Sequence, residues 1–489
     1  MCLSKVVQKS CSTNLQLHLS LSHAAQNSSV SIMQDFFATA NHFYFAGVAG
    51  AGMSAIAQYL VGVGKQVSGT DRLFNTSDND ATKTILEKDG IVCYNQLEAH
   101  LNSSHDVLVV STAIEETNIE VAKARELNIP IVTRAQLLAQ ICDHKKTIAI
   151  AGTSGKSTTA AMLYHVLHVN GLAPSLITGA GLVDLIQQGK IGNCAVGDSD
   201  ILIIEADESD GSLVNYKASI GVLLSIDKDH KELSELHDIF STFKSNTKNE
   251  FIVNAGHALC APYSNNTQHD FGANSGTHSS NFQQSGFSIS FEVEGITINM
   301  PCIGAHNMEN ALACIAVAKL FGCTVQQCAT ALATYPGIYR RHQLLGKHAG
   351  ITLIDDYAHN PAKIAASIKA CQPVANKLIA WFQPHGYGPT RFIRKELVEE
   401  IVAALRPQDE MWMSEIYYAG GTAVKDISAQ DLISDLTAQG VKAFFVNDRN
   451  DLHAHMQSHF TEDTVVLLMG ARDPGLEKFA GSFWASLQK

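Results

Sequence analysis

Short apolar segments alternate with longer helix-like segments along most of the chain, beginning near residue 41. Residues 42–46 (HFYFA) have the character of a buried strand and lead into a glycine-rich turn at 47–52. A helix-like stretch at 53–63 and a second apolar strand at 106–111 follow. This succession of strand, glycine turn, helix and strand predicts a βαβ unit.

The same alternation begins again after residue 144. A β-branched strand at 147–151 (TIAIA) enters a second glycine-containing loop, which is followed by a helix-like stretch. The segments 200–205 and 220–226 are continuously apolar, and this predicts parallel strands that are covered on both faces. Residues 264–285 are rich in Ser, Asn, Gln and Gly and are expected to form a surface loop. A helix is expected at 307–321.

The last region, from about residue 338 to the C-terminus, also alternates between strand-like and helix-like segments. Helix-like runs lie at 362–371 and 391–405, between apolar runs. This pattern predicts a further doubly wound α/β unit. The strand-like runs are 351–354, 378–382, 411–414, 443–446 and 465–469.

Composition narrows the classes of function. A length of 489 residues suggests about three domains. The 35 basic and 47 acidic residues give a net charge of −12, which argues against a protein that coats nucleic acid or anionic lipid. No run approaches 18 uncharged apolar residues, so no membrane span is predicted. The eleven cysteines form no C-x-x-C pair, which argues against a zinc site and favours reduced thiols in a cytoplasmic protein.

The strongest candidate site is the loop Gly152-Thr153-Ser154-Gly155-Lys156-Ser157-Thr158. Its glycines allow backbone N–H groups to turn towards phosphate oxygens at the start of a helix. Lys156 is suited to the outer phosphates, and Ser157 is suited to Mg²⁺. Ile150 stands where the usual phosphate-loop pattern has its first glycine, but the strand before the loop and the helix after it are the expected context.

Acidic side chains follow two of the predicted strands. Glu205 begins the run EADESD at the end of one apolar strand, and Asp227 begins DKDH at the end of the next. Packed carboxylates repel one another unless a cation neutralises them, so both runs favour Mg²⁺ sites over the alternative of solvated acidic turns. Two cations beside a phosphoryl group would suit charge neutralisation during transfer, with His230 at the second position.

The first glycine turn, Gly47 to Gly52, precedes Asp71 by nineteen residues counted from Gly52. The order G-x-x-G-x-G differs from the usual dinucleotide fingerprint. We interpret it as a diphosphate-binding turn with an acidic partner for a ribose or sugar hydroxyl. An NAD-dependent dehydrogenase is an alternative that rests on this turn alone and leaves the second loop unexplained.

Taken together, these motifs resemble the Mur ligase family of peptidoglycan precursor synthesis. The resemblance implies an N-terminal Rossmann-like domain for the UDP-sugar, a central P-loop-type ATPase domain with a mostly parallel sheet, and a C-terminal Rossmann-like domain for the amino acid. With the alternation above, the predicted boundaries are 1–40 for a weakly structured extension, then 41–144, 145–336 and 337–489. The matching stretches are GVAGAGMSAIA (47–57), SGTD (68–71), STAI (111–114), AGTSGKST (151–158), EADESDGS (205–212), DKDH (227–230), GAHNMENALA (304–313), GIYRRHQ (337–343), DDYAHNP (355–361) and FQPH (382–385).

The resemblance also implies roles for single residues. The catalytic set would be Lys156, Glu205, His230 and Arg341, with Mg²⁺ held by Ser157, Glu205 and His230. ATP would be bound by Gly152, Thr153, Ser154, Gly155, Lys156, Ser157, Thr158, His306, Asn307, Asn310, Arg341 and Asp356. The UDP-sugar would be bound by Gly47, Gly50, Gly52, Met53, Asp71 and Thr112, and the acceptor would lie near Tyr357, His359 and His385. His306 and Asn307 could instead cap a helix, and Arg341 could form a surface ion pair.

The chain departs from the family pattern in three places. Ser154 stands where a His or Asn is usual, and the backbone cradle is expected to survive that change. Gly386 and Pro389 replace two arginines that are expected to face the carboxylate of the incoming amino acid, and neither residue can form a bidentate clamp. Ala358, in DDYAHNP, is closer to the relatives that recycle murein peptides.

The resemblance therefore implies an ATP-dependent, Mg²⁺-dependent amide ligase that adds an amino acid, with L-alanine favoured, to UDP-N-acetylmuramate through an acyl phosphate. Its partners would be these small molecules, with no nucleic acid or membrane among them. Two alternatives remain open. The acceptor could be a preformed tripeptide, or the chain could be a nucleotide-binding regulator that has lost ligation.

Overall fold

The computed structural model describes residues 34–75, 81–209, 211–227, 231–273, 275–418, 420 and 423–489. His230 lies outside the described residues, as do most of the residues in the predicted 1–40 extension. Within that extension, Asp35 caps the short helix α2, Phe36–Thr39, by accepting a hydrogen bond from the backbone of Ala38. The rest of the chain, Asn41–Lys489, is one compact unit, described below by its sheets.

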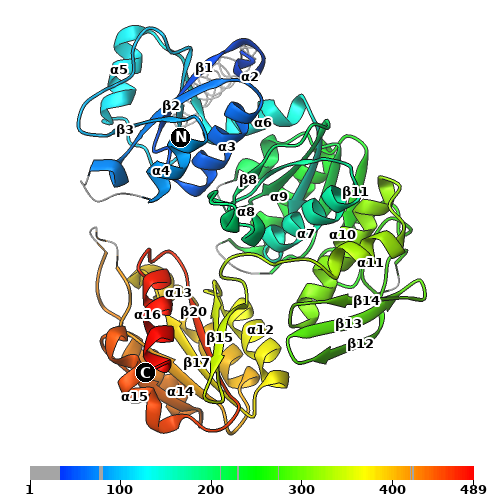
Figure 1. Cartoon of the computed structure of the whole chain (residues 1–489), viewed down its shortest axis with the longest axis vertical. Coiled ribbons are helices and arrows are strands. Elements are labelled where there is room, and N and C mark those ends of the chain that lie inside the picture. The colour runs from blue at the N-terminus through cyan, green and yellow to red at the C-terminus, as the bar shows by residue number, and fades with distance from the viewer. Residues whose placement is uncertain are drawn as a thin grey trace, which may run out of the picture. The chain divides into compact units, whose positions relative to one another are not determined.

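The first sheet follows the predicted βαβ pattern (Figure 1). Its five strands are all parallel and run in the order β3-β2-β1-β4-β5. β1 is buried along almost its whole length, which accounts for its uniformly apolar sequence. The elements are β1 His42–Ala46, α3 Ala51–Gly62, β2 Gln66–Asp71, α4 Ala81–Lys88, β3 Val92–Asn95, β4 Val107–Val110, α5 Ile119–Leu127, β5 Ile131–Thr133 and α6 Arg134–Asp143.

The second sheet carries the phosphate loop. Its order is β11-β10-β6-β9-β7-β8, and only β8 is antiparallel to its neighbour. The strands are β6 Lys146–Ala151, β7 Ser175–Ile177, β8 Cys194–Ala195, β9 Ile201–Ala206, β10 Ile220–Leu223 and β11 Glu250–Val253. The helices are α7 Lys156–Val169, α8 Val183–Gln187, α9 Leu233–Asn246, α10 Ala305–Leu320 and α11 Val325–Leu332.

A small antiparallel sheet was not expected from the sequence. Its order is β12-β13-β14, with bounds Ser280–Ser285, Ser288–Val293 and Ile296–Met300. The prediction of a surface loop over 264–285 is therefore wrong for its last six residues. β12 is polar and mostly exposed, so it shows no apolar alternation, whereas its partner β13 buries every second side chain.

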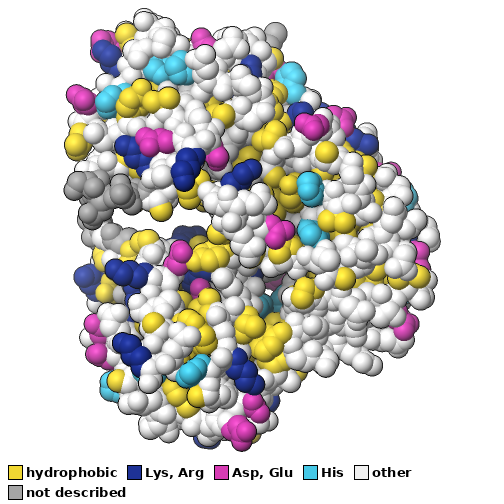
Figure 2. Space-filling view, viewed as in Figure 1, with side chains coloured by type: hydrophobic (Ala, Val, Ile, Leu, Met, Phe, Trp, Pro, Cys, Tyr) yellow, Lys and Arg dark blue, Asp and Glu magenta, His cyan; other side chains and the backbone are white. Residues whose placement is uncertain are grey.

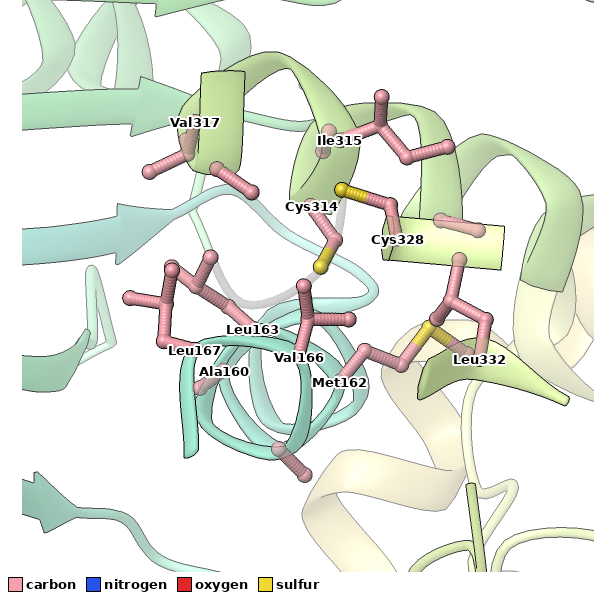
Figure 3. Packing of buried hydrophobic residues seen from close by; sticks show 14 of the residues in the cluster. Ala160, Met162, Leu163, Val166, Leu167, Cys314, Ile315, Val317, Cys328 and Leu332 are labelled. Atoms are coloured by element: carbon pink, nitrogen blue, oxygen red, sulfur yellow. The ribbon is translucent and has the colours of Figure 1, made fainter. Parts of the chain in front are cut away.

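The packing of α7 against α10 and α11 forms the core beside the phosphate loop (Figure 3). Met162, Leu163 and Val166 of α7 are fully buried, as are Cys314 and Cys328 of the two facing helices. Burial raises the pKa of the Cys328 thiol to about 12, which makes it unreactive. All nine cysteines among the described residues are free thiols. Because the two long helices pack along their sides, the first turn of α10 is held next to the first turn of α7.

The third sheet mixes one antiparallel edge strand with parallel strands, in the order β15-β16-β20-β17-β18-β19. The last strand, β20, lies between β16 and β17, so the chain returns past β18 and β17 after β19. The strands are β15 Gln343–His348, β16 Ile351–Asp356, β17 Lys377–Gln383, β18 Glu410–Met413, β19 Lys442–Phe445 and β20 Thr464–Gly470. The helices are α12 Pro361–Cys371, α13 Tyr387–Ala404, α14 Ala429–Ala438, α15 Leu452–Met456 and α16 Leu476–Leu487.

These sheets confirm the predicted α/β class with mostly parallel strands, while the boundaries between the three domains stay predictions. On the described part of the face in Figure 2, acidic and basic side chains are interspersed. Among the helices that the structure describes, none has the length and apolar character needed to cross a bilayer.

Candidate active site

The phosphate loop takes a shape that requires its two glycines. Gly152 has φ +133°, and a Cβ there would lie 2.9 Å from the backbone nitrogen of Ser225. Gly155 has φ +85° and precedes α7, and a Cβ there would lie 2.5 Å from Oδ1 of Asn310. Both sites therefore exclude a side chain on two grounds, backbone conformation and space. The loop leads directly into the N-terminus of α7, which is a favourable place for an anion, and phosphate binding there stays a prediction.

Replacing Gly155 by alanine should lower kcat/KM for ATP by about 100-fold, because the added Cβ must displace Asn310 or the loop itself. Gly171→Ala is the matched control. Gly171 also has a positive φ, +78°, but a Cβ there meets nothing within 4 Å. It should cost about 1–2 kcal/mol of unfolding free energy and leave the ATP kinetics unchanged. Equal kinetic losses in the two variants would contradict the loop assignment.

Lys156 begins α7 and reaches back across the loop. Its Nζ donates to the carbonyl of Gly152 at 2.8 Å and to Oε2 of Glu208 at 2.7 Å. Asp207 lies 3.6 Å away. Burial alone would lower the pKa of Lys156, but the charges of Glu208 and Asp207 outweigh it and raise the pKa. Lys156 is thus a fully charged ammonium, held at the loop by two carboxylates.

The acidic run after β9 has more negative charge than Lys156 can neutralise. Glu205, Asp207 and Glu208 all act on the single ammonium. Burial raises the pKa of Glu208, with Asp207 adding to the effect, while Lys156 opposes it. Thr178 donates a short hydrogen bond to Oε1 of Glu205. This excess of hard oxygen ligands beside a phosphate loop fits Mg²⁺.

Of the three predicted metal ligands, the structure describes Ser157, in the first turn of α7, and Glu205, at the end of β9. The third, His230, cannot be placed. Within the described ranges, no group of three or more His, Cys, Asp and Glu side chains is arranged to hold a metal ion. Ser157 and Glu205 remain the predicted ligands.

Two residues after β10 fix the loop, and sequence reasoning did not single out their contacts. Ser225 Oγ accepts a hydrogen bond from the backbone of Ser154 at 3.0 Å. Asp227 accepts from Thr153 Oγ1 at 3.1 Å, and its own backbone N–H donates to the same hydroxyl at 3.0 Å. Since Ser154 is held through its backbone, the departure from the family's usual His or Asn leaves the cradle intact. The sequence signal that could have found Ser225 and Asp227 was their position directly after a strand of the same sheet. In the structure that strand, β10, pairs with β6, which leads into the loop.

Three predicted ATP residues lie in the first two turns of α10, and Asn310 among them lies beside the loop. Asn310 accepts from Thr159 of α7 at 3.2 Å and donates to Asn307 at 3.4 Å. His306 lies against His342, with ring centroids 5.2 Å apart. Burial, with the neighbouring His342, lowers the pKa of His306 to about 3, so its ring is neutral. The N-cap of α10 is Gly304 with no side-chain cap, so neither His306 nor Asn307 caps the helix.

The neighbouring side chains of Arg340 and Arg341 make different contacts. Arg340 forms a bidentate ion pair with Asp355, at 2.8 and 3.2 Å. The Arg341 guanidinium lies 5.0 Å over the ring of Tyr357, and it makes no ion pair with a carboxylate in the described ranges. The surface ion pair considered for Arg341 is therefore absent from that part of the chain.

Asp356, the predicted ribose ligand, is buried at the end of β16. Its oxygens accept hydrogen bonds from the backbone of His342 at 2.7 Å and Ala358 at 2.8 Å, and from Ser367 Oγ at 2.9 Å. Burial opposes its charge, but His342 and Arg341 outweigh burial and lower its pKa. Asp356 is thus an ionised group that shapes the turn below Arg341.

The three predicted acceptor residues lie together. The rings of Tyr357 and His359 are 5.6 Å apart, and those of His359 and His385 are 5.9 Å apart. Gly386, with φ +71°, is the N-cap of α13. The nearest arginine of that helix, Arg391, pairs with Asp426. No arginine of α13 is thus available as a clamp at this end of the sheet.

The first glycine turn, the predicted diphosphate site, is held by hydrogen bonds to its backbone, and its role in binding stays a prediction. Gly47 has φ +82°, and its backbone N–H donates to Thr70 at 2.7 Å. Both oxygens of Asp71 accept backbone hydrogen bonds, from Ala49 at 2.9 Å and Leu73 at 3.0 Å. Asp71 therefore shapes the turn. Of the remaining predicted UDP-sugar residues, Gly50 is the N-cap of α3, Gly52 packs against Arg134, Met53 is buried and Thr112 is exposed.

Three family models match the chain in succession: the Mur ligase family catalytic domain at residues 42–146, the Mur ligase middle domain at 150–318, and the Mur ligase glutamate ligase domain at 340–472. The chain is 33% identical to a UDP-N-acetylmuramate–L-alanine ligase of Geotalea daltonii, over 88% of this chain and 94% of that protein. It is 32% identical to the ligase of the same name from Geobacter sulfurreducens, over 91% and 95%. The chain belongs to the Mur ligase family.

Solved structures support the same fold. The UDP-N-acetylmuramate-alanine ligase of Thermotoga maritima superposes with a TM-score of 0.74 at 24% identity, covering 91% of this chain and 99% of that one. A murein peptide ligase from Psychrobacter arcticus superposes with a TM-score of 0.64 at 22% identity, covering 92% and 99%. At these identities the superpositions establish the fold, and the activity is argued below.

Proposed function

We propose that this protein is an ATP-dependent, ADP-forming ligase that joins L-alanine to the carboxylate of UDP-N-acetylmuramate in peptidoglycan precursor synthesis. The observation that carries the proposal is the match, at 33% identity and across 88% of the chain, to a relative named for that reaction. A charged phosphate-loop lysine with acidic neighbours supports the ATP half of the reaction. The free thiols of the described cysteines support a cytoplasmic location.

The reaction proceeds in two chemical steps. The substrate carboxylate attacks the γ-phosphorus of ATP, forming an acyl phosphate and releasing ADP. The uncharged amine of the amino acid then attacks the acyl carbon, and the tetrahedral intermediate expels phosphate to leave an amide. Lys156 and Arg341 stabilise the negative charge on the transferring phosphoryl group. Because water would hydrolyse the acyl phosphate, the site must be closed during the reaction.

Mg²⁺ would neutralise phosphate charge when bound, and Ser157 and Glu205 would hold it. We propose that two Mg²⁺ ions bind and that His230 helps to hold the second. His306, Asn307 and Asn310 would contact the adenine side of ATP, and Asp356 the ribose. In the first domain, Gly47, Gly50, Gly52, Met53, Asp71 and Thr112 would form the UDP-sugar site.

A second candidate is a ligase that adds a preformed peptide. The observation that favours it is the start of α13, where Gly386 and Pro389 provide no guanidinium and Arg391 is paired with Asp426. The alternative that the protein is a nucleotide-binding regulator without ligase activity also rests on the replacements at Gly386 and Pro389. The dehydrogenase alternative rests on the Gly47 turn alone.

An acceptor panel tests the proposal. With ATP, Mg²⁺ and UDP-N-acetylmuramate, L-alanine should drive ADP release and amide formation, while the tripeptide L-alanyl-γ-D-glutamyl-meso-diaminopimelate should not. ADP release is measured by a coupled assay and the amide by mass spectrometry. Turnover with the tripeptide alone would assign the second candidate. ATP binding without amide product from any acceptor would assign the regulator.

A further inference from the structure

Helix α3 contacts both the first sheet and the second. It packs against β2 of the first sheet, and against β7 and β8 of the sheet that carries the phosphate loop. Every residue from Met53 to Leu60 is buried, so the middle of the helix is covered on all sides. Its first turn comes directly after the glycine turn that is proposed to bind the UDP-sugar. α3 therefore connects the proposed sites of the two substrates of the first chemical step.

The side chain of Asn193 binds the second sheet to the first two turns of α3. Asn193 directly precedes β8 and is 2% exposed. Its Nδ2 donates to the carbonyl of Ala51 at 2.7 Å and to Oγ of Ser54 at 2.9 Å. Its Oδ1 accepts from Nε2 of Gln58 at 2.8 Å. Both amide protons and the amide oxygen of Asn193 thus have buried partners on α3.

The backbone of Asn193 is in turn bound to the neighbour of a predicted Mg²⁺ ligand. Its carbonyl accepts from the backbone N–H of Thr178 at 3.0 Å. The hydroxyl of Thr178 donates to the carboxylate of Glu205. Hydrogen bonds therefore run without a gap from the first turn of α3 to Glu205. A shift of α3 relative to Glu205 must lengthen or break one of them, and buried hydrogen bonds are costly to leave unmade.

The other end of α3 makes a second close contact with the same sheet. Gly62 is the last residue of α3, and Val196 follows β8. A Cβ at position 62 would lie 2.5 Å from Cγ2 of Val196 and 3.0 Å from its Cβ. Because the Cβ of Val196 is itself this close, a rotamer change of Val196 would not relieve the contact. α3 is thus held against the second sheet at both ends.

We propose that Asn193 is a positioning residue for the first chemical step, and that it fixes α3 so that the carboxylate of the sugar nucleotide is aligned with the γ-phosphate of ATP. This role rests on the proposed ligase function. The sugar nucleotide and ATP would be bound by different sheets, so their alignment depends on how rigidly the two sheets are joined. A misplacement of about 1 Å lowers a rate by about 100-fold, while each substrate still binds to its own site.

Asn193→Ala should lower kcat by about 100-fold. The dissociation constants of UDP-N-acetylmuramate and of adenylyl imidodiphosphate with Mg²⁺, each measured alone by calorimetry, should equal those of the wild type. The urea midpoint should fall, because buried groups on α3 lose their partner. Thr147→Val is the matched control. Thr147 is fully buried at the start of β6 and donates to the carbonyl of Cys142 at 3.0 Å. Its loss should lower the urea midpoint and leave kcat unchanged.

Gly62→Ala tests the position of α3 without removing a hydrogen bond. The added Cβ must move α3 away from Val196, so kcat should fall while both dissociation constants stay at the wild-type values. Alanine favours a helix more than glycine does, so a loss of helix cannot explain the slower reaction. Gly481→Ala in α16 is the control, because a Cβ there meets nothing within 4 Å. Its kcat should equal that of the wild type.

The positioning role is overturned if Asn193→Ala lowers the urea midpoint but leaves kcat unchanged, since Asn193 is then only structural. It is also overturned if the variant weakens the binding of UDP-N-acetylmuramate alone by as much as it lowers kcat, since Asn193 then shapes the sugar site. A wild-type kcat in Gly62→Ala contradicts it as well. A wild type that forms no amide contradicts the proposed function instead, which separates the two failures.

Discussion

Lys156→Ala is expected to lower kcat for ligation by about three orders of magnitude, because the transferring phosphoryl group loses a charged donor in the site. The structure shows the ammonium already in place, bound to the carbonyl of Gly152 inside the loop. Glu208 and Asp207 raise its pKa above the ordinary value, so the ammonium is charged at neutral pH. ADP release and amide formation should fall together.

The same substitution also has an effect on stability, which must be separated from the chemistry. Glu208 is buried, with 7% of its side chain exposed, and Lys156 is its ion-pair partner. Removing one partner of a buried pair costs about 3–5 kcal/mol, because the other charge is left unpaired. Urea unfolding should show this loss in the single variant. The double variant Lys156→Ala/Glu208→Gln should recover stability without recovering activity.

The stability loss of Lys156→Ala should depend on pH, and the ionisation of the Glu208 carboxyl group determines the direction. Burial already raises the pKa of Glu208, and removal of Lys156 raises it further. A carboxyl whose folded-state pKa exceeds its unfolded value destabilises the fold only above the unfolded pKa. The deficit of Lys156→Ala relative to the wild type should therefore be absent at low pH and grow as the pH rises through the folded-state pKa of Glu208 in the wild type, which lies above its ordinary value. Ligation retained in either Lys156 variant would contradict the phosphate-loop assignment.

The sequence was sufficient for the fold class and for the phosphate loop because both depend on local patterns. Continuous apolar strands such as β6 and β9 have the composition that a doubly covered parallel sheet requires. Gly152 and Gly155 occupy conformations and spaces that exclude side chains, so their positions in the sequence already specify the turn. The packing of α7 on α10 then brings Asn310 to the loop from a distant part of the chain.

Contacts between distant side chains could not be predicted in this way. Nothing local distinguishes Ser225, whose hydroxyl binds the loop only because β10 pairs with β6. Strand β12 was missed because its stability comes from its neighbour β13 and not from its own apolar pattern. The departure at Gly386 and Pro389 was visible in the sequence. The pairing of Arg391 with Asp426 was not visible in the sequence.

The adjacent residues Arg340 and Arg341 illustrate the same limit, because identical side chains one position apart face different partners. Arg340 and His342 both have positive φ, 55° and 47°, and the backbone N–H of Tyr357 donates to the carbonyl of Arg340 at 2.8 Å. This turn directs Arg340 into Asp355, and both guanidinium groups lie over the ring of Tyr357, at 5.6 Å for Arg340 and 5.0 Å for Arg341. Arg340 is held in an ion pair with a buried carboxylate, whereas Arg341 makes no ion pair among the described residues, and its contact with ATP stays a prediction.

Arg341→Ala should therefore lower kcat by about 10³–10⁵-fold, the range for an arginine that stabilises a transferring phosphoryl group, while lowering the urea midpoint far less than Arg340→Ala does. Arg340→Ala should instead lower the free energy of unfolding and have a smaller effect on kcat. It leaves Asp355, which is 5% exposed, without its partner, and so should cost about 3–5 kcal/mol of unfolding free energy. Its kcat, measured where the variant is still folded, should fall far less than that of Arg341→Ala. If the two variants instead exchange these effects, the γ-phosphate ligand is Arg340, and the pairing with Asp355 must break when ATP binds.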